Sequence, residues 1–92
     1  MSKLSILIPH DGDGGHRDRV AGWTVTRWRH WMPEAEVIIG GIGASPPNRA
    51  ANRNLVAELA QTDILAFMDV DTCVDIRSLR EAVELVRDPP AE

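Results

Sequence analysis

The sequence has few of the features that mark secreted, membrane-bound or nucleic-acid-binding proteins. Its single cysteine, Cys73, cannot form an internal disulfide, which fits a reducing compartment, so we expect a cytoplasmic protein. No apolar run approaches the roughly 20 residues that a membrane-spanning helix needs. Met1-Ser2-Lys3 leads directly into a strand-like segment, without the apolar region and cleavage site of a signal peptide. The sequence therefore predicts neither a membrane span nor export.

A basic excess is also absent. The chain has 14 acidic and 10 basic side chains, for a net charge of −4 at pH 7. Non-specific binding of nucleic acid needs a basic surface that displaces counterions from phosphates, so no nucleic-acid partner is expected. The negative charge is concentrated in residues 58–92, where nine acidic residues face three basic ones. Such a segment would suit a bound cation, although solvated acidic helix faces are commoner.

The length of 92 residues and the 43% apolar content indicate one ordinary domain, expected over residues 1–88 with a tail at 89–92. The hydrophobic pattern predicts three strands that alternate with three helices. The strands are expected at residues 4–9, 36–40 and 63–68, and the helices at about 17–32, 48–60 and 76–87. Continuous apolar strands in this order predict a short parallel sheet between helix layers, a three-layer α/β/α fold of Rossmann-like type with the first strand in the centre.

Helical periodicity places apolar stripes on the first two helices. Ala21, Val25, Trp28 and Met32 share one face of the first, and Ala51, Leu55 and Leu59 share one face of the second. Asn48 is expected to cap the second helix, and Asp75 the third. Trp23 points nearly opposite the first stripe, which predicts either an arginine-capped surface tryptophan or a protein contact.

Asp69-Val70-Asp71 follows directly after the third predicted strand, at the edge of the sheet where such folds bind ligands. Two carboxylates at positions i and i+2 of a chain bend can converge on a hard cation such as Mg²⁺ or Mn²⁺. That cation can bridge a diphosphate and neutralise its charge as it departs. On its own the pattern is weak evidence, because solvated turns use aspartate freely.

The context of this pair is more specific. Arg53-Asn54, Ala60, Asp63, the apolar strand and Asp69-Val70-Asp71-Thr72 follow one another in an order that resembles the GT-A glycosyltransferases of family 2. Ser5-Ile6-Leu7-Ile8-Pro9 also resembles the first strand of that family. The resemblance spans nearly the whole chain and implies the nucleotide-binding half of the GT-A nucleotide-diphospho-sugar transferase fold.

The resemblance also implies roles for particular residues. Asp71 would be the direct ligand of a Mn²⁺ or Mg²⁺ ion, and Asp69 would contact the ribose, the sugar or a metal-bound water. Arg53 and Asn54 would lie near the nucleotide. Pro9 and Asp11, at the end of the first strand, complete the expected nucleotide-sugar-binding set.

The sequence departs from the family pattern at three places. Gly40-Gly41-Ile42-Gly43 stands where the family has an aspartate pair that helps to hold the nucleobase, so base recognition must differ or be absent. Thr62 replaces a glycine before the third strand. The half that supplies the acceptor pocket and the catalytic base in family members is not present in these 92 residues, and no residue is assigned as the base.

Two functions remain open from these observations. The first is transfer of a sugar from a nucleotide diphosphate to an unknown acceptor, and the alternative is a non-catalytic binding or assembly module derived from the same fold. A sugar nucleotidyltransferase is less favoured, because Pro9-His10-Asp11 does not provide the Gly-rich loop with Arg and Lys that such an enzyme needs.

Weaker candidates lie in the predicted loop after the first strand. Asp11-Gly12-Asp13 is equally well interpreted as an aid to cation or ribose binding and as a solvated turn. Arg17 and Arg19, at a helix start, would suit a diphosphate, although arginines that face solvent are commoner. The thin core of a short chain and the two open sheet edges predict a homo-oligomer, most simply a two-fold dimer.

Overall fold

The computed structural model describes residues 3–12, 14–44, 46, 48–71 and 74–88. Asp13, Thr72, Cys73 and the predicted tail at 89–92 lie outside these residues. Strands and helices alternate as the sequence predicts, and their bounds are β1 Leu4–Pro9, α1 His16–Trp31, β2 Glu36–Gly40, α2 Arg49–Leu59, β3 Ile64–Phe67 and α3 Ile76–Arg87. The predicted bounds differ from these by one residue at most.

The sheet has the strand order β2-β1-β3, with both pairings parallel, so the prediction of a central first strand is confirmed. Ile6 of β1 is paired with Val37 of β2 and with Ala66 of β3. Among the described residues β2 and β3 each pair with β1 alone, which leaves one edge of each strand open. The dimer expected from these edges stays a prediction.

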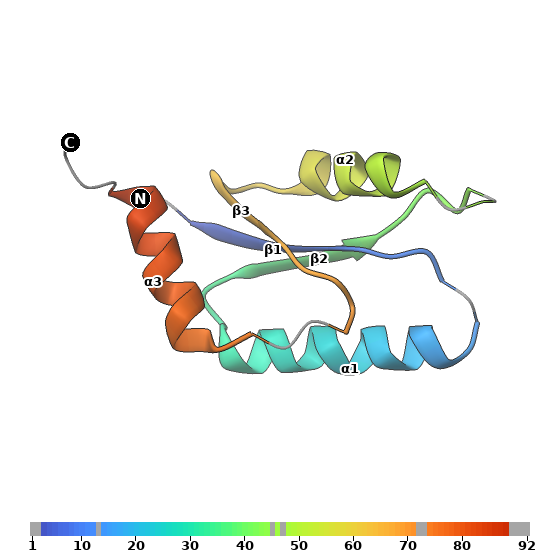
Figure 1. Ribbon diagram of the computed structural model, residues 1–92, viewed down its shortest axis with the longest axis horizontal. Coiled ribbons are helices and arrows are strands. Elements are labelled where there is room, and N and C mark those ends of the chain that lie inside the picture. Colours follow the sequence, from blue (N-terminus) through green and yellow to red (C-terminus); the bar gives the residue numbers. More distant parts are fainter. Residues whose placement is uncertain (1–2, 13, 45, 47, 72–73, 89–92) are drawn as a thin grey trace.

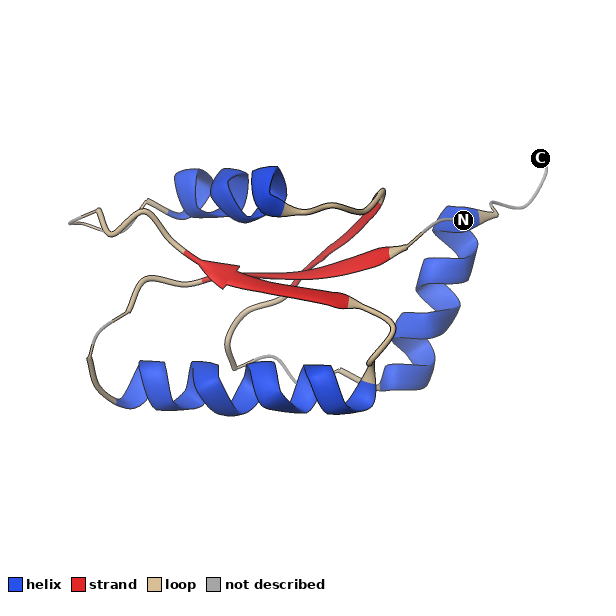
Figure 2. Ribbon diagram, turned by 180° about the vertical axis from the view of Figure 1, so that it is seen from behind, coloured by secondary structure: helices blue, strands red, loops and turns tan. Residues whose placement is uncertain are grey.

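Helices cover both faces of the sheet, as a three-layer fold requires (Figures 1 and 2). In both views α2 lies along one face, while α1 lies along the other and α3 stands beside it near one end. The main core is formed on the α1 side of the sheet, where alternate residues of β1 pack in one cluster with residues of α1 and α3. Its fully or nearly fully buried members include Leu4, Ile6, Ile8, Val25, Trp28, Leu79 and Val83.

Helix α1 confirms the predicted stripe, because Ala21, Val25, Trp28 and Met32 are all buried. The helix ends just before Met32, whose N–H still bonds to the Trp28 carbonyl at 2.8 Å, and Pro33 prevents its continuation. Trp23 lies on the opposite side and is 59% exposed.

Helix α2 is capped as predicted, since the Asn48 side chain accepts a hydrogen bond from the Ala51 N–H at 3.0 Å. The packed face of this helix differs from the predicted stripe. Its buried residues are Asn52 and Val56, whereas Leu59 is 54% exposed. Ala51 and Leu55 are partly buried, so the predicted stripe lies at the margin of the packed face. The centre of that face is formed by the fully buried Val56 and by Asn52, whose side chain is hydrogen-bonded.

Helix α3 begins at its predicted cap. The Asp75 carboxylate accepts hydrogen bonds from the Arg77 N–H at 3.2 Å and from the Ser78 hydroxyl at 3.0 Å. The amphipathic helix buries Leu79 and Val83 against the core. In the part of the chain that the structure describes, no helix combines the length and the apolar character needed to cross a membrane.

Candidate functional site

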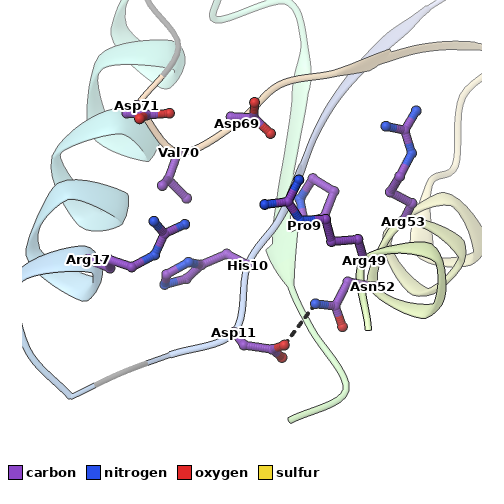
Figure 3. Close-up of a pocket in the computed structure, with 10 residues that line it drawn as sticks. All are labelled: Pro9, His10, Asp11, Arg17, Arg49, Asn52, Arg53, Asp69, Val70 and Asp71. Carbon is purple, nitrogen blue, oxygen red and sulfur yellow. Dashed lines mark hydrogen bonds between the residues drawn. The ribbon is translucent and has the colours of Figure 1, made fainter. Parts of the chain in front are cut away.

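A cleft of about 590 Å³ opens at the carboxyl end of the sheet, where the sequence places the ligand-binding rim. Figure 3 shows the end of β1 at the base of this cleft, with α1 on one side and α2 on the other. The acidic turn that follows β3 closes a further side. The lining residues are Pro9, His10, Asp11, Arg17, Arg49, Asn52, Arg53, Asp69, Val70 and Asp71.

The acidic turn is held by its middle residue. Val70 is buried, and its carbonyl accepts a hydrogen bond from the buried Thr24 hydroxyl of α1 at 2.5 Å. Just before the turn, the Met68 N–H bonds to the Leu7 carbonyl of β1 at 2.8 Å. Because the buried valine anchors the turn, the exposed Asp69 and Asp71 on either side of it line the cleft.

Asp11 joins three separate parts of the chain. Its carboxylate accepts hydrogen bonds from the Gly43 N–H at 2.8 Å and from Asn52 Nδ2 at 2.9 Å (Figure 3). The Asn52 side-chain oxygen in turn accepts one from the Ile42 N–H at 2.8 Å. The loop after β1, the loop after β2 and helix α2 are therefore tied together by one carboxylate and one amide. Asp11 thus has a structural role that neither of the two sequence interpretations of this loop included.

The crowding around Gly41 gives a reason for one of the glycines that stand where the family has an aspartate pair. A Cβ atom at this position would lie 2.3 Å from Asp11 Oδ1 and 2.7 Å from the His10 carbonyl oxygen. Real Cβ atoms do not approach other atoms so closely, so any larger residue forces the backbone or the Asp11 carboxylate to move. A glycine is required here because Asp11 crosses over the loop.

The hydrogen bonds from Asn52 and Gly43 hold the pKa of Asp11 below its ordinary value. A depressed pKa in the folded state contributes stability above the unfolded pKa of about 4, and this contribution is lost as the pH falls through the folded value. We therefore expect the stability gap between the wild type and Asp11→Asn to narrow progressively below about pH 4. Urea unfolding of both proteins from pH 7 to pH 2 measures this difference in the free energy of unfolding. A difference that stays constant over this range contradicts the lowered pKa of Asp11.

His10 and Asp18 form a second link at the cleft. The His10 side chain is only 7% exposed, and its Nε2–H donates to Asp18 Oδ1 at 2.9 Å. Asp18 Oδ2 accepts from the Gly14 N–H at 2.7 Å, so the start of α1 is fastened to the end of β1. The buried Nδ1 atom of His10 has no hydrogen-bond partner in the described part of the chain. Sequence reasoning missed this pair, because no pattern links residues eight positions apart across a loop.

Three guanidinium groups, those of Arg17, Arg49 and Arg53, line the cleft together with the aspartates. Arg17 lies at the start of α1, and Arg49 lies one turn before Arg53 on α2. In Figure 3 Arg49 extends toward Pro9, and Arg53 extends away from it. The Arg53 guanidinium lies 4.2 Å from the centre of the Phe67 ring, in a cation–π contact. Arg19 and Asn54 are exposed and are not among the lining residues.

The oxygen ligands of this turn fit a hard divalent cation. The described residues include no group of three or more His, Cys, Asp or Glu placed to hold a metal by themselves. A metal at Asp69 and Asp71 would therefore take its other ligands from the substrate and from water. Mg²⁺ sites commonly have this composition, with one or two carboxylates and the phosphates of a nucleotide.

The fold and the cleft define a class of protein, the α/β domains with a parallel sheet and a cleft at its carboxyl edge, which is where such folds bind ligands. The family model described as Glycosyl transferase family 2 matches residues 46–92, just over half of the chain. The chain therefore belongs to glycosyl transferase family 2, and its function is glycosyltransferase-like. The matched segment contains α2, β3, the acidic turn and α3. Comparisons with curated proteins and with solved structures gave no match.

Proposed function

We propose that the chain binds a nucleotide-diphosphate sugar in the 590 Å³ cleft through a Mn²⁺ or Mg²⁺ ion at Asp69 and Asp71, and that the sugar passes to an acceptor. The observation that carries this proposal is the meeting of two aspartates and three arginines at the carboxyl end of the sheet. An anionic diphosphate needs positive charge around it, and the carboxylates need a cation between them and the phosphates.

In this proposal the arginines that line the cleft contact the phosphates, and the aspartates hold the cation. Arg17 and Arg49 are in place to donate N–H groups to phosphate oxygens, because a guanidinium matches that geometry. Asp69 and Asp71 would hold the cation, which supplies neutralisation of the charge on the departing diphosphate. In the transfer, the bond between the anomeric carbon and the diphosphate oxygen breaks, and its electron pair leaves with the diphosphate. The acceptor oxygen bonds to that carbon and releases its proton to water.

The loops on the β2 side would support the nucleoside. Asp11, Asn52 and Gly41 fix the rim next to Pro9, at the place where the family's aspartate pair is missing. A rim held by internal hydrogen bonds offers a preorganised surface, which lowers the entropic cost of binding. Asn54 lies one helical position beyond Arg53 and, being exposed, would reach a ligand only at the outer margin of this site.

Calorimetric titration with UDP- and GDP-sugars, with and without Mn²⁺, tests the proposal. We expect saturable binding of at least one of these nucleotide sugars in Mn²⁺ and its loss in EDTA, because the aspartates repel a diphosphate when no cation intervenes. Equal affinity in EDTA and in Mn²⁺ would refute the metal-dependent mode, and no binding in either condition would refute the donor site itself.

Substitution of the cleft arginines gives a graded prediction. Arg49→Ala is expected to weaken nucleotide-sugar binding about tenfold, the usual order for a lost hydrogen bond to a charged group. Arg53→Ala is expected to cause a smaller loss, because its guanidinium stacks on Phe67 and extends away from Pro9. Arg87→Ala is the control, since Arg87 pairs with Glu84 on α3, away from the cleft. Equal calorimetric affinities for all three variants contradict the prediction.

A further inference from the structure

Strand β3 has one open edge. In the described part of the chain it pairs with β1 alone, and Figures 1 and 2 show it on the outside of the sheet, in front of β1 in one view and behind it in the other. The N–H groups of Ile64 and Met68 bond to carbonyls in or next to β1, at 3.1 and 2.8 Å. Because the backbone groups of a strand point alternately to its two edges, those of Leu65 and Phe67 point to the open edge.

The side chains of β3 leave an apolar strip uncovered on the α2 side of the sheet. Ile64 and Ala66 belong to the core on the α1 side, so Leu65 and Phe67 face the α2 side. Helix α2 packs mainly on β1 and β2, and Leu65 is 41% exposed although it lies within the sheet. Leu59, the last residue of α2, is 54% exposed. An open edge with apolar side chains is a template for the addition of another strand.

We propose that two copies of the chain associate through antiparallel pairing of their β3 strands, around a two-fold axis at Leu65, to form one continuous sheet of six strands. The directions of the backbone groups and of the side chains select the same register. Opposite residues in an antiparallel pair exchange two hydrogen bonds when both point to the shared edge, and their side chains lie on one face. Leu65 opposite Leu65 of the second copy meets both conditions. Leu65 opposite Ala66 meets neither, because the backbone groups of Ala66 point to β1.

Charged groups near β3 complement each other across this axis. The Arg53 guanidinium lies 4.2 Å from the centre of the Phe67 ring. In the Leu65 register, Phe67 stands opposite Asp63 of the second copy. The Asp63 carboxylate is held at the start of the strand by a hydrogen bond from the Lys3 N–H at 3.0 Å. An arginine of each copy therefore comes near a carboxylate of the other, and the two-fold axis repeats this pair.

Other surfaces of the described chain fit a second copy less well. The five residues of β2, at the other edge of the sheet, are all partly buried. Trp23 on α1 is 59% exposed, but the guanidinium carbon of Arg27 lies 4.1 Å from the centre of its ring and 3.7 Å from that of Trp31. The prediction that an arginine caps this tryptophan is confirmed. Because one face of the Trp23 ring is already covered, β3 offers the more complementary surface.

Light scattering after size exclusion, at micromolar concentration, tests the association. We expect the wild type at about twice the chain mass of 10.2 kDa and Leu65→Lys at the mass of one chain, because two like charges would stand directly opposite each other. Leu85→Lys is the matched control, since Leu85 is also exposed, at 59%, but lies on α3. Circular dichroism of both variants checks the fold. A wild type with the mass of one chain, or a folded Leu65→Lys variant that stays dimeric, overturns the proposal.

A disulfide tests the register without placing a charge in the interface. The variants carry Cys73→Ser, which removes the single native thiol. Leu65→Cys is expected to form a dimer on oxidation, because opposite residues that exchange hydrogen bonds have Cα atoms about 5.5 Å apart, within the range of a disulfide. Leu85→Cys controls for random collision. Non-reducing electrophoresis measures the product, and equal cross-linking of both variants, or none in Leu65→Cys, overturns the proposal.

A charge exchange tests the complementarity. Arg53→Asp and Asp63→Arg are each expected to weaken the dimer about tenfold, and the double variant is expected to recover most of this loss because the opposite charges face each other again. Sedimentation equilibrium measures the dissociation constants. A double variant no tighter than either single variant contradicts the Leu65 register. This contact needs no bound nucleotide sugar, so its test is separate from that of the proposed function.

Discussion

Replacing Asp71 with asparagine is expected to abolish Mn²⁺-dependent nucleotide-sugar binding while the fold stays intact. The amide keeps the shape of the side chain but removes the negative charge that would hold the cation. Removal of a residue that only orients a metal ligand already weakens metal affinity about 10–100-fold. Removal of a direct ligand should therefore weaken it more than about 100-fold. Folding should be spared, because Asp71 is exposed and the Thr24–Val70 hydrogen bond holds the turn without it.

Asp75→Asn is the matched control for this experiment. It makes the same change of charge four residues further on, and asparagine caps a helix about as well as aspartate does. Calorimetry in Mn²⁺ and thermal unfolding are measured for both variants. Similar affinities for Asp71→Asn and Asp75→Asn would remove Asp71 from the metal site, whereas a lower melting temperature in Asp71→Asn alone would show a structural role instead.

Asn52→Leu is expected to have the largest effect on stability. Asn52 is only 5% exposed, and its amide serves both the Asp11 carboxylate and the Ile42 N–H. Leucine has a similar volume but can make neither hydrogen bond. Asp11 keeps the hydrogen bond from the Gly43 N–H, and the exposed Ile42 N–H can turn to water, so the cost is that of lost hydrogen bonds and not of stranded buried groups. We expect a loss of about 1 kcal/mol in the free energy of unfolding, and a fall of about 4–8 °C in melting temperature.

Asn54→Leu makes the same substitution on the same helix at an exposed position. Surface changes of this kind usually stay within about 0.5 kcal/mol, so the control should unfold close to the wild type in urea. Comparable destabilisation by Asn52→Leu and Asn54→Leu would mean that leucine on α2 is harmful in general, and that the network of Asp11, Asn52 and Ile42 contributes little.

Much of the fold could be predicted because its signals are local. Strands β1, β2 and β3 are apolar runs that end in turn residues or prolines, and Asn48 and Asp75 precede their helices by one position. The parallel order then followed from the alternation of strands and helices and from the handedness of the crossovers. The Asp69-Val70-Asp71 pattern was visible for the same reason, since it stands at the end of a strand.

The details of the cleft could not be predicted, because its partners lie far apart in the sequence. Asn52 meets Asp11 across 41 positions, and Thr24 meets Val70 across 46. A hydrophobic pattern predicts which residues are buried, but it does not predict which distant polar groups form hydrogen bonds with each other. The packed face of α2 differs from the predicted stripe for the same reason, since the buried Asn52 meets its partners Asp11 and Ile42 in distant loops, which the helical pattern does not show.

The sequence by itself therefore determined the order of the strands and helices, the parallel sheet and the position of the paired aspartates at its edge. Only the tertiary structure decided that Asp11 is a structural carboxylate, that Gly41 must be small, and that Arg27 lies between Trp23 and Trp31. The physical reason is the range of the forces involved. Backbone preference and burial act through neighbouring residues, whereas hydrogen bonds and stacking require atoms within a few ångströms, which only the folded chain brings together.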